Sequence, residues 1–416
     1  MMEKLMVDSL VLWTEQYKID GYRFDLMGHH MVSNMTKALE AVQAIDPDNY
    51  FYGEAWNFGE VANGARGRNA IQKHIGGTGI GTFNDRARDA VRGGGPFDSG
   101  DALRARQGYG TGLYFYPNEL ADEAEVAKAD LLERSDWIRL SLTGNLANYP
   151  LPSHTGEPVL GKDLAYFDQA AGYTYDPQEN VNYISKHDNQ TLWDNLQYKA
   201  PNTLSTADRT RMQNFSLSVP MLSQGIVFLH MGVDVLRSKS LQRDSFDAGD
   251  WYNSVDFTGL SHNWNIGLPS KDKDGQNYGI IAKVIQDPNA KPNFENIDLA
   301  KKLFKEWLSI RKSSPLFSLQ SEQAVLDGVK FLNTGPDSMP GLIVMQITDT
   351  QAIDENYEEI ILVFNPSNTE QQIAYSAEAF SLHPVQMNSA DMTVRTASAA
   401  TDGFTVPALT TAVFVK

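Results

Sequence analysis

Short strand-like segments alternate with helical segments along the first part of the chain, and this alternation limits the fold more than any other feature. Apolar side chains recur at helical spacing over residues 2–17 and 33–45, while residues 19–26 (IDGYRFDL) and 49–56 (NYFYGEAW) are typical of strands. Strands that alternate with helices pair in parallel, because each helix returns the chain to the same end of the sheet. The sequence therefore predicts an α/β fold.

Polar residues stand where the predicted strands end. Five such ends lie near Asp25, Glu54, Asn84, His187 and His230. A (β/α)8-type barrel carries its functional groups at the C-terminal ends of its parallel strands. We therefore predict a barrel of this type that is partial, because only about five of its eight strands can be recognised.

Two changes in composition divide the rest of the chain. The stretch around residues 93–180 is rich in Gly, Pro, Asp and Tyr, so we expect an insertion that is irregular. After residue 316, apolar runs such as GLIVMQIT and EIILVFNPS are separated by turn residues, which is typical of antiparallel strands. We predict a catalytic barrel part over residues 1–316 and a C-terminal all-β domain, an antiparallel β-sandwich, over residues 317–416.

The composition argues against several kinds of partner. The 416 residues include 35 basic and 52 acidic side chains, a formal net charge of −17, so the chain repels nucleic acid and anionic membranes. The absence of cysteine excludes disulfides and thiolate metal sites. No apolar run is long enough to span a membrane, and the first residues lack the pattern of a secretory signal. A neutral ligand meets no such repulsion.

Two acids lie at the ends of neighbouring predicted strands. Asp25 and Glu54 are 54 − 25 = 29 residues apart, about one strand–helix unit, and neighbouring strands lie roughly 4.8 Å apart. A retaining glycosidase holds its two carboxyl groups about 5–5.5 Å apart, so this spacing is compatible with glycoside hydrolysis. Arg23 shares a strand face with Asp25 and is expected to keep it ionised. For Glu54 we expect an apolar surround, beside Gly53 and Trp56, of the kind that an acid catalyst requires.

Three strings carry a resemblance to a known family. GYRFDLMGH, FYGEAWNFG and YISKHDNQ resemble the second, third and fourth conserved regions of the α-amylase superfamily, glycoside hydrolase family 13. The longer strings YISKHDNQTLWDN, GVDVLRSKSLQRDSFDAGDWYNSVDFT and FNDRARDAVRGG resemble type I pullulanases and plant limit dextrinases, the α-1,6 debranching enzymes. The resemblance covers essentially the whole chain.

Position by position, the resemblance implies three catalytic acids. Asp25 resembles the nucleophile and Glu54 the general acid/base. Asp188 resembles the third acid, which hydrogen-bonds sugar hydroxyls and distorts the ring towards the transition state. These roles are implied by the matching motifs and are expectations for this chain.

The same motifs imply substrate-binding residues. Arg23 resembles the arginine beside the nucleophile, His187 the hydroxyl-binding histidine beside the third acid, and Trp56 an aromatic stacking platform on the acceptor side. His29 or His30 matches the histidine that closes the second region. The two histidines can also be considered as metal ligands, but adjacent side chains point to different faces and the spacing matches no common zinc pattern. Packing or subsite lining is favoured.

The resemblance implies hydrolysis of α-1,6-glucosidic branch links in pullulan, starch or glycogen by a retaining double displacement. The expected partner is a branched α-glucan, with no nucleic acid, no membrane contact by this chain, and a monomer when full length. No organic cofactor is implied. Enzymes of this group often hold structural calcium, but the sequence names no ligand set for it. A secreted or cell-surface location is favoured for a bacterial homologue.

The chain also departs from the family pattern. The first conserved region and the tyrosine-containing motif typical of pullulanases should precede the second region, and neither is present. We therefore expect the C-terminal part of a longer protein, without the first three barrel strands and with two exposed sheet edges. This leaves an alternative: an inactive fragment with residual carbohydrate binding. A relative that cuts α-1,4 links is disfavoured by the debranching-type strings.

Overall fold

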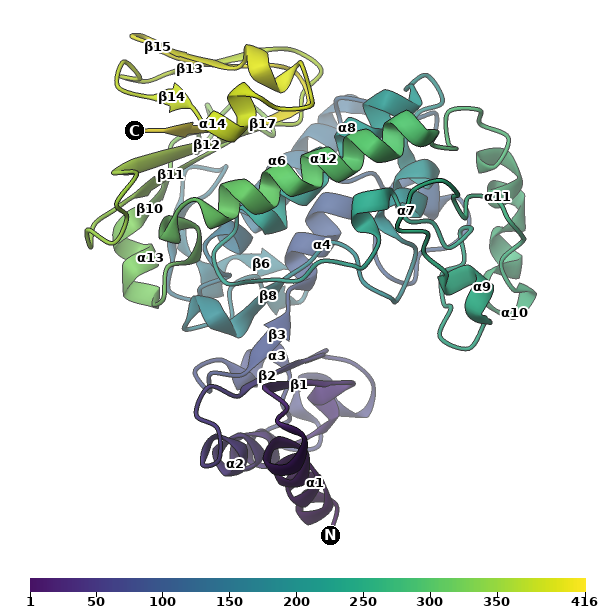
Figure 1. The fold of residues 1–416 in the computed structure, drawn as a ribbon, viewed down its shortest axis with the longest axis vertical. Coiled ribbons are helices and arrows are strands. Elements are labelled where there is room, and N and C mark those ends of the chain that lie inside the picture. The colour runs from purple at the N-terminus through teal and green to yellow at the C-terminus, as the bar shows by residue number, and fades with distance from the viewer.

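A five-stranded parallel sheet forms the centre of the first three-quarters of the chain. The computed structural model describes all of residues 1–416 (Figure 1). The strands follow one another across the sheet in chain order, namely β1 (Gly21–Phe24), β2 (Tyr50–Gly53), β3 (Gly81–Phe83), β8 (Asn180–Asn182) and β9 (Ile226–Val227). The five predicted strands are confirmed, but β8 ends at Asn182, before the end predicted near His187. The sheet is open, because β1 pairs only with β2 and β9 only with β8, and the barrel type stays a prediction.

The first 75 residues form a lobe at one end of the molecule, called here the N-terminal lobe (Figure 1). It contains α1 (Met2–Tyr17), α2 (Val32–Gln43), α3 (Gln72–Ile75) and the strands β1 and β2. Leu10, Met35 and Phe51 belong to its own buried cluster of 12 residues. The opposite face of α1 leaves large apolar side chains exposed, so this lobe buries only one side of its first helix.

The stretch predicted to be irregular contains the 19-residue helix α6 (Ala124–Leu142), so that expectation is wrong over this range. Arg134, Asp136 and Arg139 lie on buried positions of α6, and they hide the apolar period that would reveal a helix. Around it lie α4 (Asp85–Arg92), α5 (Ala102–Ala105), and the two hairpins β4 (Pro150–Pro152) with β5 (Pro158–Leu160) and β6 (Ala165–Tyr166) with β7 (Gln169–Ala170).

Helices α7 (Leu192–Lys199) and α8 (Thr206–Met221) lie between β8 and β9 along the chain, and α12 (Phe294–Lys312), which follows β9, packs against α8. Ser205 accepts a hydrogen bond from the backbone of Asp208, whose side chain accepts one in return, so α8 begins with a capping box. The short helices α9 (Asp250–Asn253), α10 (Lys271–Asp274) and α11 (Tyr278–Val284) lie between α8 and α12 along the chain. None of the helices is both long enough and apolar enough to cross a bilayer.

Two antiparallel sheets face each other at the C-terminal end. The larger has the order β10 (Val329–Phe331), β11 (Ile343–Thr348), β12 (Glu359–Asn365), β17 (Thr410–Val415) and β14 (Ser381–Leu382), and the smaller has the order β13 (Gln371–Ala374), β16 (Gly403–Val406) and β15 (Ser398–Ala400). Side chains from both sheets form one buried cluster of 13 residues, as in a sandwich. The short helices α13 (Glu322–Gly328) and α14 (Pro384–Met387) interrupt the strands, and the division of the chain at residue 316 stays a prediction.

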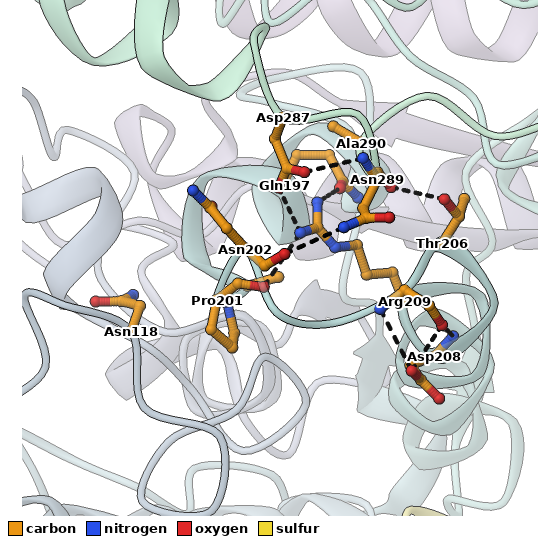
Figure 2. Close-up of polar contacts among 12 residues, drawn as sticks. Asn118, Gln197, Pro201, Asn202, Thr206, Asp208, Arg209, Asp287, Asn289 and Ala290 are labelled. Atoms are coloured by element: carbon orange, nitrogen blue, oxygen red, sulfur yellow. Dashed lines mark hydrogen bonds and ion pairs between the residues drawn. The ribbon is translucent and has the colours of Figure 1, made fainter.

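A buried arginine fixes the junction between α7 and α8 (Figure 2). The Arg209 guanidinium donates to Gln197 Oε1 at 2.7 Å, to the Pro201 carbonyl at 3.1 Å and to Asp287 Oδ2 at 2.5 Å. The Asp287 carboxylate also accepts from the backbone of Asn289. One side chain of α8 therefore holds the end of α7, the following loop and the segment before α12.

We expect Arg209→Met to lower the free energy of unfolding by about 3–5 kcal/mol, because the buried Asp287 carboxylate would lose its cation. The measurement is urea denaturation followed by circular dichroism. Lys302→Met is the matched control, since it breaks the exposed ion pair with Asp298 and should leave stability nearly unchanged. Equal effects of the two substitutions would contradict the structural role of the Arg209 network.

Candidate active site

The register of β1 and β2 places two acids side by side. Phe24 and Gly53 are paired residues of the two strands, and Asp25 and Glu54 are the next residues along each strand. The backbone of Glu54 donates to the Phe24 carbonyl at 3.1 Å, which continues the ladder by one step. The backbone of Leu26 in turn donates to Glu54 Oε2 at 3.1 Å. The sequence prediction that these acids end neighbouring strands is therefore confirmed.

Arg23 joins the two acids through one guanidinium. Its Nη1 lies 2.8 Å from Asp25 Oδ1, and its Nη2 lies 3.0 Å from Glu54 Oε1. The hydrogen bond from Arg23 lowers the pKa of Asp25 below its usual value, so this carboxylate is ionised at neutral pH. Arg23 therefore lies beside Asp25, where the sequence predicted it. The Asp25 side chain is 71 % exposed, so it is open to an incoming ligand.

A lysine that the sequence analysis did not select connects the third acid to this pair. Lys186 Nζ lies 2.6 Å from Glu54 Oε1 and 2.5 Å from Asp188 Oδ2, and the lysine is buried. Burial raises the pKa of Asp188, but the hydrogen bond and charge of Lys186 outweigh it, so the net shift is downward. The available signal was the spacing of two residues in KHD, the same spacing that singled out Arg23 and Asp25.

The apolar surround expected for Glu54 is wrong. The side chain is only 5 % exposed, but its carboxylate contacts two cations, Arg23 and Lys186. Gly53 and Trp56 are its neighbours in sequence, whereas the charged groups come from β1 and from the segment after β8. The chemical environment of this acid is thus set by tertiary contacts that local sequence does not show.

Of the predicted binding residues, His187 and Trp56 lie at the site. His187 Nε2 is 3.5 Å from Asp188 Oδ1, and burial lowers the pKa of His187. Its backbone carbonyl accepts a hydrogen bond from Lys239 Nζ at 2.7 Å, which fixes the segment that carries Asp188. The Trp56 ring lies 5.9 Å from Lys186 Nζ and borders the cleft described below.

The two histidines after β1 diverge, as expected for adjacent side chains. His29 Nε2 lies 3.5 Å from Glu60 Oε1, and its ring meets Phe58, while the ring of His30 meets Phe24 edge-on. Neither histidine has a hydrogen bond or ion pair to the three acids, and burial lowers the pKa of His30. No group of three or more His, Asp or Glu side chains in the structure is arranged to hold a metal ion.

A cleft of about 400 Å³ opens beside Lys186 and Asp188. Most of its lining is polar or charged, including Arg88 and Asp244, and aromatic rings such as Trp56 form the apolar part. Polyhydroxylated ligands need hydrogen-bond partners around their edges and flat apolar surfaces against their faces. The cleft offers both next to Asp188, the one of the three acids that lines it.

A family model described as "Alpha-1,6-glucosidases, pullulanase-type, C-terminal" matches residues 259–416. Over 100 % of its length, the chain is 42 % identical to "Pullulanase 1, chloroplastic" of Arabidopsis thaliana and covers 45 % of that protein. It is also 42 % identical to a pullulanase of Klebsiella pneumoniae, over 99 % of this chain and 38 % of the relative. The chain thus spans less than half the length of these curated relatives.

Solved structures show the same likeness. PulA from Klebsiella oxytoca superposes with a TM-score of 0.94 at 42 % identity, over 99 % of this chain and 39 % of that chain. A maltotriose complex of PulA from Klebsiella pneumoniae superposes with a TM-score of 0.93 at 41 % identity, over 99 % of this chain and 44 % of that one. Because both superpositions cover 99 % of this chain, the similarity of fold extends over the parallel sheet and the C-terminal sheets alike.

We expect Lys186→Met to raise the pKa of Asp188, because the substitution removes the hydrogen bond and the charge that lower it. A lowered carboxyl pKa stabilises the fold above the unfolded value of 3.8, and this contribution is lost as the pH falls through the lower folded pKa. The protonation of Asp188 at acid pH should therefore cost the Lys186→Met variant less folding stability than it costs the wild type.

Carbon-13 NMR titration of the Asp188 carboxyl, together with urea denaturation at several acid pH values, measures both effects. Lys162→Met removes an exposed lysine elsewhere and should change neither. An Asp188 pKa that is the same in wild type and Lys186→Met would show that Lys186 does not control this carboxylate.

Proposed function

We propose that the chain belongs to the pullulanase-type α-1,6-glucosidase family and that it hydrolyses α-1,6-glucosidic branch links in pullulan, starch or glycogen. The observation that carries the proposal is the contact of one guanidinium, that of Arg23, with two carboxylates at the ends of adjacent strands. Glycoside hydrolysis requires two carboxyl groups that flank one glycosidic linkage. The cleft beside Lys186 and Asp188 offers the polar and aromatic lining that a glucan needs.

In the proposed reaction, an ionised Asp25 oxygen attacks the anomeric carbon and forms a covalent glycosyl ester. The bond between the anomeric carbon and the glycosidic oxygen breaks, and the protonated Glu54 carboxyl donates its proton to that oxygen. In the second half, Glu54 takes a proton from water while the water oxygen attacks the same carbon and releases Asp25. Two displacements at one carbon retain its configuration.

The remaining residues bind and orient the sugar. We propose that Asp188 accepts hydrogen bonds from sugar hydroxyls and that Lys186 holds Asp188 and Glu54 in fixed relation, since its ammonium contacts both. His187 is 61 % exposed next to Asp188 and can reach the same hydroxyls. Trp56 lines the cleft as an apolar platform. No step of this reaction uses a metal ion or an organic cofactor.

A second candidate function is binding of branched glucan without turnover. The exposure of Asp25, and of Asp188 at 42 %, favours it, because water weakens the electrostatic contacts that stabilise a transition state. The chain would then retain the cleft and the platform of Trp56 without an enclosed reaction centre.

We expect the purified chain to release maltotriose from pullulan and Asp25→Asn to lower this rate by at least about 10³-fold, because the amide cannot form the glycosyl ester. Reducing-end assays and chromatography of the products measure the rate and the bond that is cut. Asp20→Asn is the matched control, since Asp20 is an exposed acid at the other end of β1 and should leave the rate unchanged.

The outcomes separate the candidates. Near-normal turnover by Asp25→Asn would remove Asp25 as the nucleophile. Panose or isopanose among the products would indicate cleavage of α-1,4 links. Binding of pullulan in affinity electrophoresis by a wild-type chain that releases no sugar would support the second candidate and overturn the first.

A further inference from the structure

Two segments that line the cleft lie outside any helix or strand. Asp188 belongs to residues 184–190, called here the Asp188 segment. Arg243 and Asp244 belong to residues 236–244, called here the Arg243 segment. The first segment follows β8, and the second lies between β9 and α9. Hydrogen bonds of regular secondary structure do not set the spacing of the two segments, so other contacts must do so.

The backbone of the Arg243 segment has a conformation that side chains disfavour. Leu236, Ser240 and Leu241 have φ angles of 56°, 53° and 66°, in the left-handed region that favours glycine. All three residues are buried. Such a conformation costs free energy and persists only where the surrounding structure imposes it, most often at functional sites. The Arg243 segment therefore needs a strong local restraint.

Asp194, on α7, supplies this restraint. Its carboxylate accepts hydrogen bonds from Ser238 Oγ and from the backbone N–H groups of Lys239 and Leu241, the last two at 2.8 and 3.2 Å. Ser238 Oγ in turn accepts from the backbone of Ser240 at 2.9 Å. Asp194 is fully buried, and burial raises its pKa. One carboxylate thus closes the turn that contains two of the left-handed residues.

Lys239 joins the Arg243 segment to the Asp188 segment. Its Nζ donates to the His187 carbonyl, in the Asp188 segment, at 2.7 Å. The same Nζ donates more weakly to the Arg243 carbonyl, in its own segment, at 3.5 Å. Lys239 is only 1 % exposed, so water does not compete for these contacts. A single ammonium therefore contacts the backbone of both segments.

The burial of Lys239 is not explained by stability. Burial lowers the pKa of Lys239 to about 8, and the charges of Arg237 and Arg92 act in the same direction. The charges of Asp194 and Asp188 oppose this shift. A buried cation costs free energy, and an apolar side chain of similar length would serve the fold as well. A local arrangement that costs stability is typical of a functional site.

We propose that Asp194 and Lys239 are positioning residues for the cleft. Asp194 holds the Arg243 segment in its left-handed turn, and Lys239 fixes this segment to the Asp188 segment. Neither residue lines the cleft, so both act through the backbone of the segments that do. The inference rests on the proposed function, since it gives these two buried residues a part in binding a glucan.

Lys239→Met tests the inference, because methionine has nearly the length of lysine but lacks the ammonium. We expect hydrogen exchange in both segments to become at least about tenfold faster, as measured by mass spectrometry on the full chain. The dissociation constant for maltotriose, measured by calorimetry, should rise at least about tenfold. The melting temperature should stay within about 2 °C of the wild-type value, since the variant no longer buries a charge.

Turnover of pullulan gives a further measurement on the same variant. A loss of folded protein would lower kcat and leave KM unchanged. Displacement of the two segments should instead raise KM at least about tenfold and lower kcat less than about threefold. The reason is that the hydrogen bonds of Lys239 go to the two segments and not to Asp25 or Glu54.

Two further variants complete the comparison. Asp194→Asn should speed exchange in the Arg243 segment and weaken maltotriose binding, because the amide cannot accept from all three donors as the carboxylate does. Ile361→Ala is the control. It opens a cavity between the C-terminal sheets and should lower the melting temperature without a change in maltotriose binding or in exchange of either segment.

Unchanged exchange in Lys239→Met, or an equal loss of maltotriose binding in Ile361→Ala, would overturn the proposal. A Lys239→Met chain that does not fold, or that melts as low as Ile361→Ala, would also overturn it, since the role of Lys239 would then be structural. If Asp194→Asn does not fold, Lys239→Met decides alone. A wild-type chain that does not bind maltotriose would overturn the proposed function, and the exchange measurement would still decide whether Lys239 joins the two segments.

Discussion

The contact between Lys186 and Glu54 is the interaction on which the geometry of the candidate site depends. Glu54 belongs to the N-terminal lobe, and Lys186 belongs to the segment after β8, so their 2.6 Å contact joins two parts of the molecule. Both side chains are 5 % exposed, and a buried ion pair is stable only if its remaining polar atoms are satisfied. Arg23, Leu26 and Asp188 supply those partners, so the acids and cations form one continuous network.

This network explains how three acids can be held close to one another. Carboxylates that share a small volume repel one another, and without cations this repulsion would favour protonation of one of them. Here a cation stands between each neighbouring pair, Arg23 between Asp25 and Glu54, and Lys186 between Glu54 and Asp188. The alternation of charge sign lets the acids approach one ligand from the ends of β1 and β2 and from the segment after β8.

The sequence predicted what depends on local pattern. Strands β1 and β2 and the pairing of Arg23 with Asp25 follow from alternation along the chain, and the structure confirms them. Lys186 was missed because its two partners lie in different parts of the sequence, and only folding brings Glu54 to it. The helix α6 was missed because the buried charges of Arg134, Asp136 and Arg139 look like a solvated surface when the sequence is read alone.

Short ladders connect the N-terminal lobe to the rest of the molecule. Two residue pairs join β2 to β3, and two more join β3 to β8. Asp25 and Glu54 lie together on the lobe side of these ladders, whereas Asp188 lies beyond them. A bending motion of so narrow a sheet would have to break a contact of Lys186 before the third acid could move away from the first two, because the ammonium binds both Glu54 and Asp188. The same lysine therefore acts as a mechanical brace across the narrow ladders, in addition to its effect on the charges of the acids.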